Sequence, residues 1–224
     1  MKVHVKKEPG LSVLISGHTG ATGSFLLDRL IADDDVARIV ALGRRHVTAL
    51  DAAPKVQQIV VADMADLSGV DPAEVGDIDI AFDLVATPLK EAFNGEEAYR
   101  KVDVDIATEC ARFARSRGAR FLGAIAVEGA DSDRDFGKDY SRPAKRDFIR
   151  NVRAMGFERI AMLYPAWVSR EQGFRLSEFL FTWGGRKGVK ASAMAKVLAW
   201  AAQNQETGER AYSEKEIKRI ATQG

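Results

Sequence analysis

The sequence predicts an α/β fold in which a doubly wound parallel sheet forms a single domain. Three observations predict it: short apolar runs recur, helix-like segments separate most of them, and the runs are continuously apolar instead of alternating. Parallel strands are buried on both faces and therefore read as continuous apolar runs. We expect six strands in the sheet order 3-2-1-4-5-6, at residues 11–15, 38–42, 58–61, 78–85, 121–125 and 159–163.

Helical periodicity separates and follows these strands. Gly118 and Gly156 stand where two helices would end, because glycine adopts the left-handed conformation that helix C-termini favour. Pro143 suits a first helical turn, with Ser141 or Arg142 as the cap. The glycine-rich segment 184–188 predicts a loop near the substrate end of the sheet. The expected helices are residues 20–32, 95–117, 143–155, 191–204 and 214–221.

The first strand runs into the glycine-rich turn G-H-T-G-A-T-G and then into an amphipathic helix. In this context Gly17 permits a tight turn, Gly20 lets the backbone approach a pyrophosphate, and Gly23 lets the helix pack close to the strand. Free N–H groups at the helix start then face the phosphates. The sequence thus predicts a Rossmann-type dinucleotide site; the alternative is a βα turn without a ligand. The expected binding residues here are Gly17, Thr19, Gly20, Ala21, Thr22 and Gly23.

Two arginines follow the second strand, where a fold that prefers NAD normally carries an acidic residue for the ribose hydroxyls. Guanidinium groups bind phosphate by charge-assisted bonds, so Arg44 and Arg45 favour NADP(H) over NAD(H). The alternative is a solvated surface pair. Asp63 would sit near the adenine edge or serve as a turn residue. We also expect cofactor contacts from Met64, Ala86, Thr87 and Val102.

One domain accounts for residues 1–224, with a cofactor-binding core at 1–163 and a substrate-side loop with closing helices at 164–224. We expect the substrate pocket under residues 167–188. An aromatic group in and around this stretch could line that pocket, although core packing is the commoner role of such residues. The group is Trp167, Phe174, Phe179, Phe181 and Trp183.

Composition excludes several classes of protein. A net charge of +1, from 33 basic and 32 acidic residues, offers no general attraction to nucleic acid or an anionic membrane. The single cysteine, Cys110, precludes an intrachain disulfide and suits a small core position, and His4, His18 and His46 have no metal-ligand spacing. For the same reason, we expect no metal site. No secretion signal or membrane-spanning run is found, so we expect a soluble cytoplasmic protein.

Several motifs resemble those of the atypical short-chain dehydrogenase/reductases, in particular the Tat-interacting-protein-like oxidoreductases. The resemblance covers most of the chain and includes the glycine turn. It also rests on Leu42-Gly43-Arg44-Arg45, on the segment 99–105, on Glu128-Gly129-Ala130-Asp131 and on the segment 164–168.

The resemblance implies a catalytic serine before the G-A-D segment and a Tyr-x-x-x-Lys pair at the head of the next helix. Here Ala126-Val127 replaces the serine, and Tyr140 and Lys145 are five residues apart. A hydroxyl would hold the carbonyl, tyrosine would exchange its proton, and lysine would lower the tyrosine pKa. Five residues rotate two side chains about 140° apart on a helix, so Tyr140 and Lys145 meet only if Tyr140 precedes the helix. The alternative for Tyr140 is an ordinary anchoring phenol. The alternative for Lys145 is a solvated charge in the first helical turn.

The resulting hypothesis is an NADP(H)-dependent oxidoreductase that acts on a small carbonyl or quinone-like substrate. The alternative is a non-catalytic NADP(H)-binding sensor or scaffold that has lost the serine and signals to a protein partner. A nucleotide-sugar epimerase or dehydratase is disfavoured, because only about 60 residues follow the sixth strand, few for a sugar-nucleotide lobe.

Overall fold

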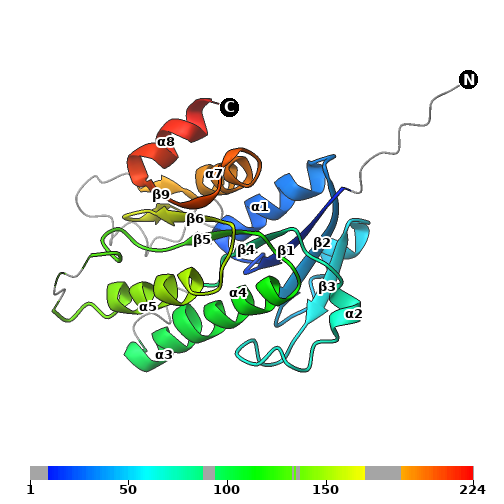
Figure 1. The fold of residues 1–224 in the computed structure, drawn as a ribbon, viewed down its shortest axis with the longest axis horizontal. Coiled ribbons are helices and arrows are strands. Elements are labelled where there is room, and N and C mark those ends of the chain that lie inside the picture. The colour runs from blue at the N-terminus through cyan, green and yellow to red at the C-terminus, as the bar shows by residue number, and fades with distance from the viewer. Residues whose placement is uncertain (1–9, 88–93, 133, 135–136, 170–187, 224) are drawn as a thin grey trace, which may run out of the picture.

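The computed structural model describes residues 10–87, 94–132, 134, 137–169 and 188–223 (Figure 1). A seven-stranded parallel sheet has the order β3-β2-β1-β4-β5-β6-β9. The six expected strands and their order are confirmed. The strands are β1 Leu11–Ser16, β2 Val36–Gly43, β3 Val56–Val60, β4 Ile80–Asp83, β5 Phe121–Ile125, β6 Arg159–Tyr164 and β9 Gly208–Ser213; β7 Val168–Ser169 and β8 Val189–Lys190 form a separate parallel pair.

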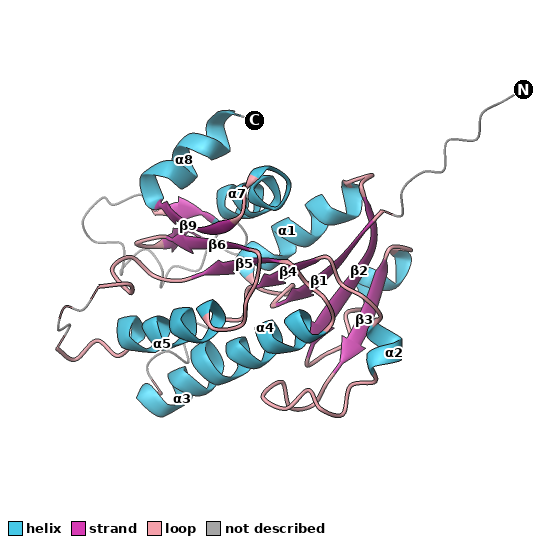
Figure 2. Ribbon diagram, in the orientation of Figure 1, coloured by secondary structure: helices cyan, strands magenta, loops and turns pink. Residues whose placement is uncertain are grey.

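Helices cover both faces of the sheet, as Figure 2 shows. On one face lie α1 (Ala21–Ala32), α7 (Ala191–Asn204) and α8 (Glu214–Gln223). The other face carries α3 (Glu96–Arg100), the π-helical turn η2 (Lys101–Ile106), α4 (Ala107–Ser116) and α5 (Ser141–Arg153). The short helices η1 (Thr48–Ala52) and α2 (Pro72–Val75) flank β3 in the chain.

Two apolar clusters, one on each face, form the core. Along β1, Val13 and Ile15 belong to one cluster and Leu14 to the other, because successive side chains of a strand point to opposite faces. All three side chains are almost fully buried. This explains why β1 reads as a continuous apolar run, and it confirms the doubly wound arrangement.

Helix boundaries differ from the expectation in two places. The predicted helix 95–117 is interrupted by η2, and Gly118 and Gly156, with φ of 97° and 72°, end their helices as expected. Helix α5 begins at Ser141, with Tyr140 as its N-cap residue. The expected cap by Ser141 or Arg142 is therefore wrong. Instead, the Asp139 carboxylate accepts hydrogen bonds from the Ser141 N–H (2.9 Å) and hydroxyl (2.5 Å).

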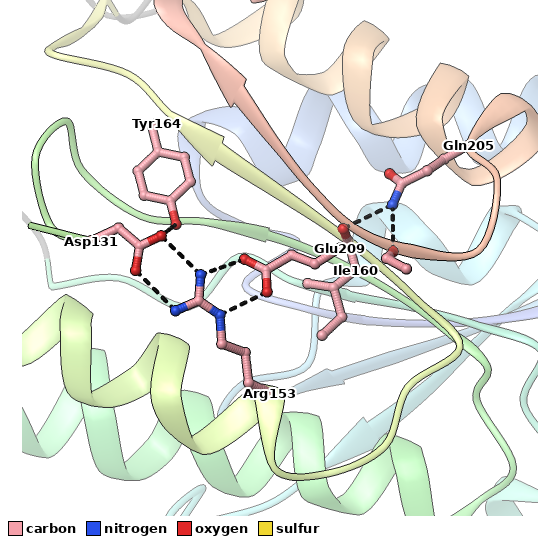
Figure 3. A network of polar contacts seen from close by, with 7 residues as sticks. Asp131, Arg153, Ile160, Tyr164, Gln205 and Glu209 are labelled. Carbon is pink, nitrogen blue, oxygen red and sulfur yellow. Dashed lines mark hydrogen bonds and ion pairs between the residues drawn. The ribbon is translucent and has the colours of Figure 1, made fainter.

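The seventh strand, β9, was not expected because five of its six residues are exposed and it lacks an apolar run. A polar network attaches it to the fold (Figure 3). Arg153 of α5 donates to Asp131 and to Glu209 of β9, at 2.7–2.9 Å, and it lowers the pKa of Asp131. Gln205 donates to the carbonyls of Ile160 (2.9 Å) and Gly208 (3.0 Å). Specific hydrogen bonds therefore supplement apolar burial at this edge.

Candidate functional site

The candidate site lies at the carboxyl ends of β1 and β4. The strand order reverses there, because β2 and β3 lie on one side of β1 while β4, β5, β6 and β9 lie on the other. In open parallel sheets the crevice at such a switch point is where ligands bind. The glycine turn, which follows β1, and the first residues after β4 meet at this point: a Cβ added to Gly17 would lie 2.4 Å from the carbonyl of Leu84.

The three glycines of the turn have different surroundings. Gly17 has a φ of 73°, and a Cβ on Gly23 would lie 2.1 Å from the Gly17 carbonyl oxygen. The fold itself therefore requires glycine at 17 and 23. A Cβ on Gly20 would meet only that same oxygen, at 3.1 Å, among the described residues, and Gly20 is exposed. Position 20 thus leaves space on its outer side that a ligand can occupy.

The start of α1 offers hydrogen-bond donors to that space. Gly20 is the N-cap residue, no side chain caps the helix, and its first turn holds no acidic residue. The first N–H groups of a helix lack partners within the helix, and the helix dipole favours an anion there. Thr19 is exposed, Ala21 is half-buried and Thr22 is buried. These features suit a pyrophosphate, the group for which the sequence predicts this turn.

The other expected cofactor residues follow neighbouring strands. Arg44 and Arg45 are exposed directly after β2, and Ala86 and Thr87 come shortly after β4. Asp63 is exposed, and its carboxylate accepts a hydrogen bond from the Ala65 N–H at 3.0 Å, so it forms a local turn. Two further residues pack with the core on the face that carries α4: Met64, which is buried, and Val102, which is half-buried. Binding by all these residues stays a prediction.

His18 lies in the glycine turn and is buried, with 4% of its surface exposed. Its ring lies against the backbone of Gly43 at the end of β2. Burial lowers the pKa of the imidazole, against the opposing effect of the Leu42 carbonyl. The histidine therefore connects the glycine turn to the strand that precedes the two arginines.

The expected catalytic pair has separate partners in the structure. Tyr140 precedes the regular turns of α5, and its ring packs edge-to-face on Tyr99 with centroids 5.6 Å apart. Lys145 is buried, and its Nζ lies 2.7 Å from Oδ1 of Asp103 on η2. The alternative interpretation of Lys145 as a solvated charge is therefore wrong, because its side chain is only 6% exposed.

Asp103 joins Lys145 to the segment after β4. Its second carboxylate oxygen accepts hydrogen bonds from the Thr87 N–H (2.8 Å) and hydroxyl (2.5 Å). Buried charges are costly unless they are paired and hydrogen-bonded, and Asp103 satisfies both conditions. Sequence reasoning missed this residue as a site component. The available signal was an acidic residue between the apolar Val102 and Val104 in a long predicted helix.

Asp83, the last residue of β4, was also missed. It is buried, and its Oδ1 accepts hydrogen bonds from the Ser16 hydroxyl at 2.8 Å and the Val85 N–H at 3.3 Å. No hydrogen bond to Oδ2 occurs among the described residues. Burial raises the pKa of Asp83 to about 7, although Ser16, Val85 and Lys145 oppose that shift. A carboxyl that titrates near neutrality thus lies beneath the switch point.

The end of β5 carries no hydroxyl. Ala126 is 5% exposed and donates its N–H to the Leu163 carbonyl, and Val127 packs against the core. The nearby hydroxyls have other partners: Ser141 donates to Asp139, and Ser132 accepts from the Arg134 N–H at 3.3 Å. Neither serine replaces the hydroxyl that the family resemblance implies at this point.

Much of the expected substrate pocket lies outside the described residues, including Phe174, Phe179, Phe181 and Trp183. Trp167 is described and is 42% exposed. Cys110 packs in the core as predicted, and burial raises the pKa of its thiol. Within the described part of the chain, no three His, Cys, Asp or Glu residues form a metal cluster, and no helix is long and apolar enough to cross a membrane.

Comparison with known proteins gives several matches. Residues 13–148 match the model of the NAD dependent epimerase/dehydratase family. Protein fmp52-1, mitochondrial, of Aspergillus oryzae is 32% identical over 161 residues, which are 70% of this chain and 65% of that protein. Protein HTATIP2 of Rattus norvegicus is 26% identical over 154 residues, 69% of this chain and 61% of that protein. The match thus spans about two thirds of each relative, and it confirms the resemblance drawn from the motifs.

Solved structures of similar fold include two proteins with low sequence identity. Serine dehydrogenase from Escherichia coli has a TM-score of 0.64 and 16% identity, over 90% of this chain and 96% of that one. MoeE5 in complex with UDP-glucuronic acid and NAD has a TM-score of 0.70 and 15% identity, over 91% of this chain and 76% of that one. At such identity the likeness shows the fold.

The expected cytoplasmic location is wrong by this comparison. The fmp52 relatives of Aspergillus oryzae and Emericella nidulans are both named as mitochondrial proteins. The expectation rested on the lack of a secretion signal and on a single cysteine, which fits a reducing compartment. Reducing conditions are not peculiar to the cytoplasm, so cysteine content could not distinguish it from other such compartments.

Proposed function

Because the chain belongs to the NAD dependent epimerase/dehydratase family, we propose that it binds NADP(H) and transfers hydride to or from a small carbonyl or quinone-like substrate. The glycine turn at the switch point carries this proposal. Gly17 and Gly23 build the turn, and the open side of Gly20 faces away from the protein. This combination suits a dinucleotide better than a βα turn without a ligand.

The choice of NADP(H) rests on the residues after β2. Gly43, Arg44 and Arg45 stand where an acidic residue would bind the ribose hydroxyls of NAD. Both guanidinium groups are exposed and can pair with a 2′-phosphate by charge-assisted bonds. The N–H groups at the start of α1 would hold the pyrophosphate.

Tyr140 is the proposed proton donor. When bound, the nicotinamide supplies or accepts the hydride. The tyrosine hydroxyl would then give a proton to the substrate oxygen during reduction, or take it during oxidation. Lys145, paired with Asp103, would position the Thr87 segment beside the cofactor. Without a hydroxyl at the end of β5 to hold the substrate carbonyl, we expect turnover to be slow.

A second candidate function is a sensor that binds NADP(H) without turnover and signals to a protein partner. Two observations favour it: Ala126 and Val127 provide no hydroxyl, and the ammonium of Lys145 is engaged by Asp103. Both observations concern the proposed catalytic residues. Neither affects the glycine turn or the two arginines that would bind the nucleotide.

A nucleotide-sugar reaction stays disfavoured, although one solved structure of similar fold, MoeE5, holds UDP-glucuronic acid and NAD. After β6, the helices α7 and α8 and the strand β9 complete the Rossmann core. Only residues 165–190 then lie between β6 and α7. That length is small for a separate sugar-nucleotide lobe.

A turnover screen with NADPH and a panel of small aldehydes, ketones and quinones distinguishes the two main candidates. We expect slow oxidation of NADPH that falls at least about tenfold in Tyr140→Phe, because general acid catalysis typically contributes about 10²–10⁴-fold. Ala126→Ser or Val127→Ser should raise the rate, because either adds a hydroxyl at the end of β5. Trp200→Phe, on α7, serves as a substitution outside the proposed site.

Each outcome of the screen has a definite meaning. Robust turnover by Tyr140→Phe would show that another group is the acid. Bound NADPH without turnover in the parent and in both serine variants would favour the sensor. Absence of NADPH binding would overturn both candidates.

A further inference from the structure

Gly43 ends β2, about 20 residues after the last glycine of the turn, where an NAD-binding fold carries its acidic residue. The backbone does not require glycine here, because Gly43 is not among the residues with positive φ. An ordinary residue could therefore adopt this conformation. Some feature of the surroundings must explain the absence of a side chain.

The side chain of His18 is that feature. A Cβ added to Gly43 would lie 2.9 Å from Cε1 of His18 and 3.7 Å from both ring nitrogens. Cβ contacts below 3.0 Å are essentially never found, so the imidazole occupies the space of a residue-43 side chain. Because His18 is buried, with 4% of its surface exposed, a side chain at position 43 would require its ring to shift within packed surroundings.

We infer that the His18 ring decides which residue position 43 can hold: it excludes an acidic side chain there, and so protects the preference that Arg44 and Arg45 create for a cofactor with a 2′-phosphate. This inference rests on the proposed function. Its role is steric: the ring excludes the carboxylate that would hydrogen-bond the ribose of NAD and repel the phosphate of NADP. Excluding a competing arrangement is a common source of specificity, alongside direct attraction.

The charges around position 43 support the inference. Arg44 and Arg45 follow at once and are exposed. A carboxylate at position 43 would pair with these guanidinium groups and compete with the 2′-phosphate for them. A glycine at position 43 leaves both arginines available. The arginines thus create the preference, and His18 protects it by keeping a carboxylate out of position 43.

The experiment is a double-mutant cycle with His18→Ala, Gly43→Asp and the combination of both. Thermal melting measures the steric contact, and calorimetric titration with NADPH and with NADH measures cofactor preference. Gly69→Asp is the matched control, because a Cβ there meets nothing within 4 Å and Gly69 has no positive φ.

We expect Gly43→Asp to lower the melting temperature far more than Gly69→Asp, and His18→Ala to relieve most of that loss. The double variant should bind NADH more tightly than Gly43→Asp does. Its affinity ratio of NADPH to NADH should fall at least tenfold from that of the parent. His18→Ala alone should keep the parent's preference, because Arg44 and Arg45 remain.

The inference is overturned if the two substitutions act additively on the melting temperature, or if the double variant keeps the parent's ratio of affinities. If the parent binds neither cofactor, the proposed function fails. The melting cycle still reports whether His18 excludes a side chain at position 43. The two failures are therefore distinguishable.

Discussion

At the scale of single residues, glycines in the first turn serve either the fold or the ligand. Gly23 faces the Gly17 carbonyl oxygen so closely that a methyl group cannot fit, whereas the outer side of Gly20 is open. We therefore predict that Gly23→Ala unfolds or strongly destabilises the protein. Gly20→Val should stay folded and lose NADPH binding. Circular dichroism and NADPH titration measure the two effects, and micromolar binding by folded Gly20→Val would contradict the assignment.

Asp83 gives a prediction about pH. Its folded-state pKa of about 7 exceeds the usual value of 3.8, so the folded state binds more protons than the unfolded state between these values. Its contribution to stability is therefore complete below about pH 4 and is lost as the pH rises through 7. Asp83→Asn should remove a slope of at most about 1.4 kcal/mol per pH unit over this range.

Urea unfolding of the parent and of Asp83→Asn at several pH values between 4 and 8 measures that slope. Ser16 can still donate to the asparagine carbonyl, so the substitution retains the hydrogen bond seen at Oδ1. We expect the variant to gain stability relative to the parent as the pH rises. Parallel pH profiles for the two proteins would show that Asp83 titrates normally in the fold.

The sequence predicted the role of a residue where its partners lie close to it along the chain. The glycines of the turn act within seven residues of sequence, so their pattern alone predicted the turn. His18, Asp83 and Asp103 act through partners far along the chain, namely Gly43, Ser16 and Lys145. Spacing in the sequence does not reveal such contacts, and the family resemblance directed attention to Tyr140 instead.

At the scale of elements, the Lys145–Asp103 pair joins α5, η2 and the segment after β4. Removing one partner of a buried ion pair typically costs about 3–5 kcal/mol, because the other charge is left buried. We predict a loss of that size for Lys145→Met. Adding Asp103→Asn should recover part of it, since the second change removes the unpaired charge.

Chemical denaturation of the two single variants and the double variant measures this coupling. Arg150→Met is the control: Arg150 pairs with Asp147 at 2.9 Å but is 75% exposed. Exposed pairs typically contribute no more than about 1 kcal/mol. Equal losses in Lys145→Met and Arg150→Met, or additive effects at 145 and 103, would contradict the assigned role of the buried pair.

Elements with a strong apolar pattern were predicted well, including the six strands and the helix at residues 191–204. Strand β9 was missed because it is polar and lies at the edge of the sheet, where the Arg153 network contributes to its attachment. The π-helical turn η2 was missed because a one-residue widening hardly alters helical periodicity. Tertiary contacts, more than local preference, decide such elements.

At the scale of the whole molecule, the parallel sheet brings the turn after β1 and the arginines after β2 to one edge. The carboxyl ends of all seven strands lie at this edge, and the strand order reverses there, which is where ligands bind in open parallel sheets. The sequence sufficed to predict this arrangement, since right-handed βαβ connections leave few alternatives. The substrate could not be predicted, because no motif between residues 165 and 190 specifies one.

Calorimetric titration of the parent and of Arg44→Ala/Arg45→Ala with NADPH and NADH tests the central claim most directly. Hydrogen bonds to charged groups contribute about 1.5–3 kcal/mol each, so the double change should weaken NADPH binding roughly tenfold or more and leave NADH nearly unchanged. Arg219→Ala, an exposed arginine on α8, should alter neither affinity. Equal affinities of the parent for NADPH and NADH, or no binding of either, would contradict the account.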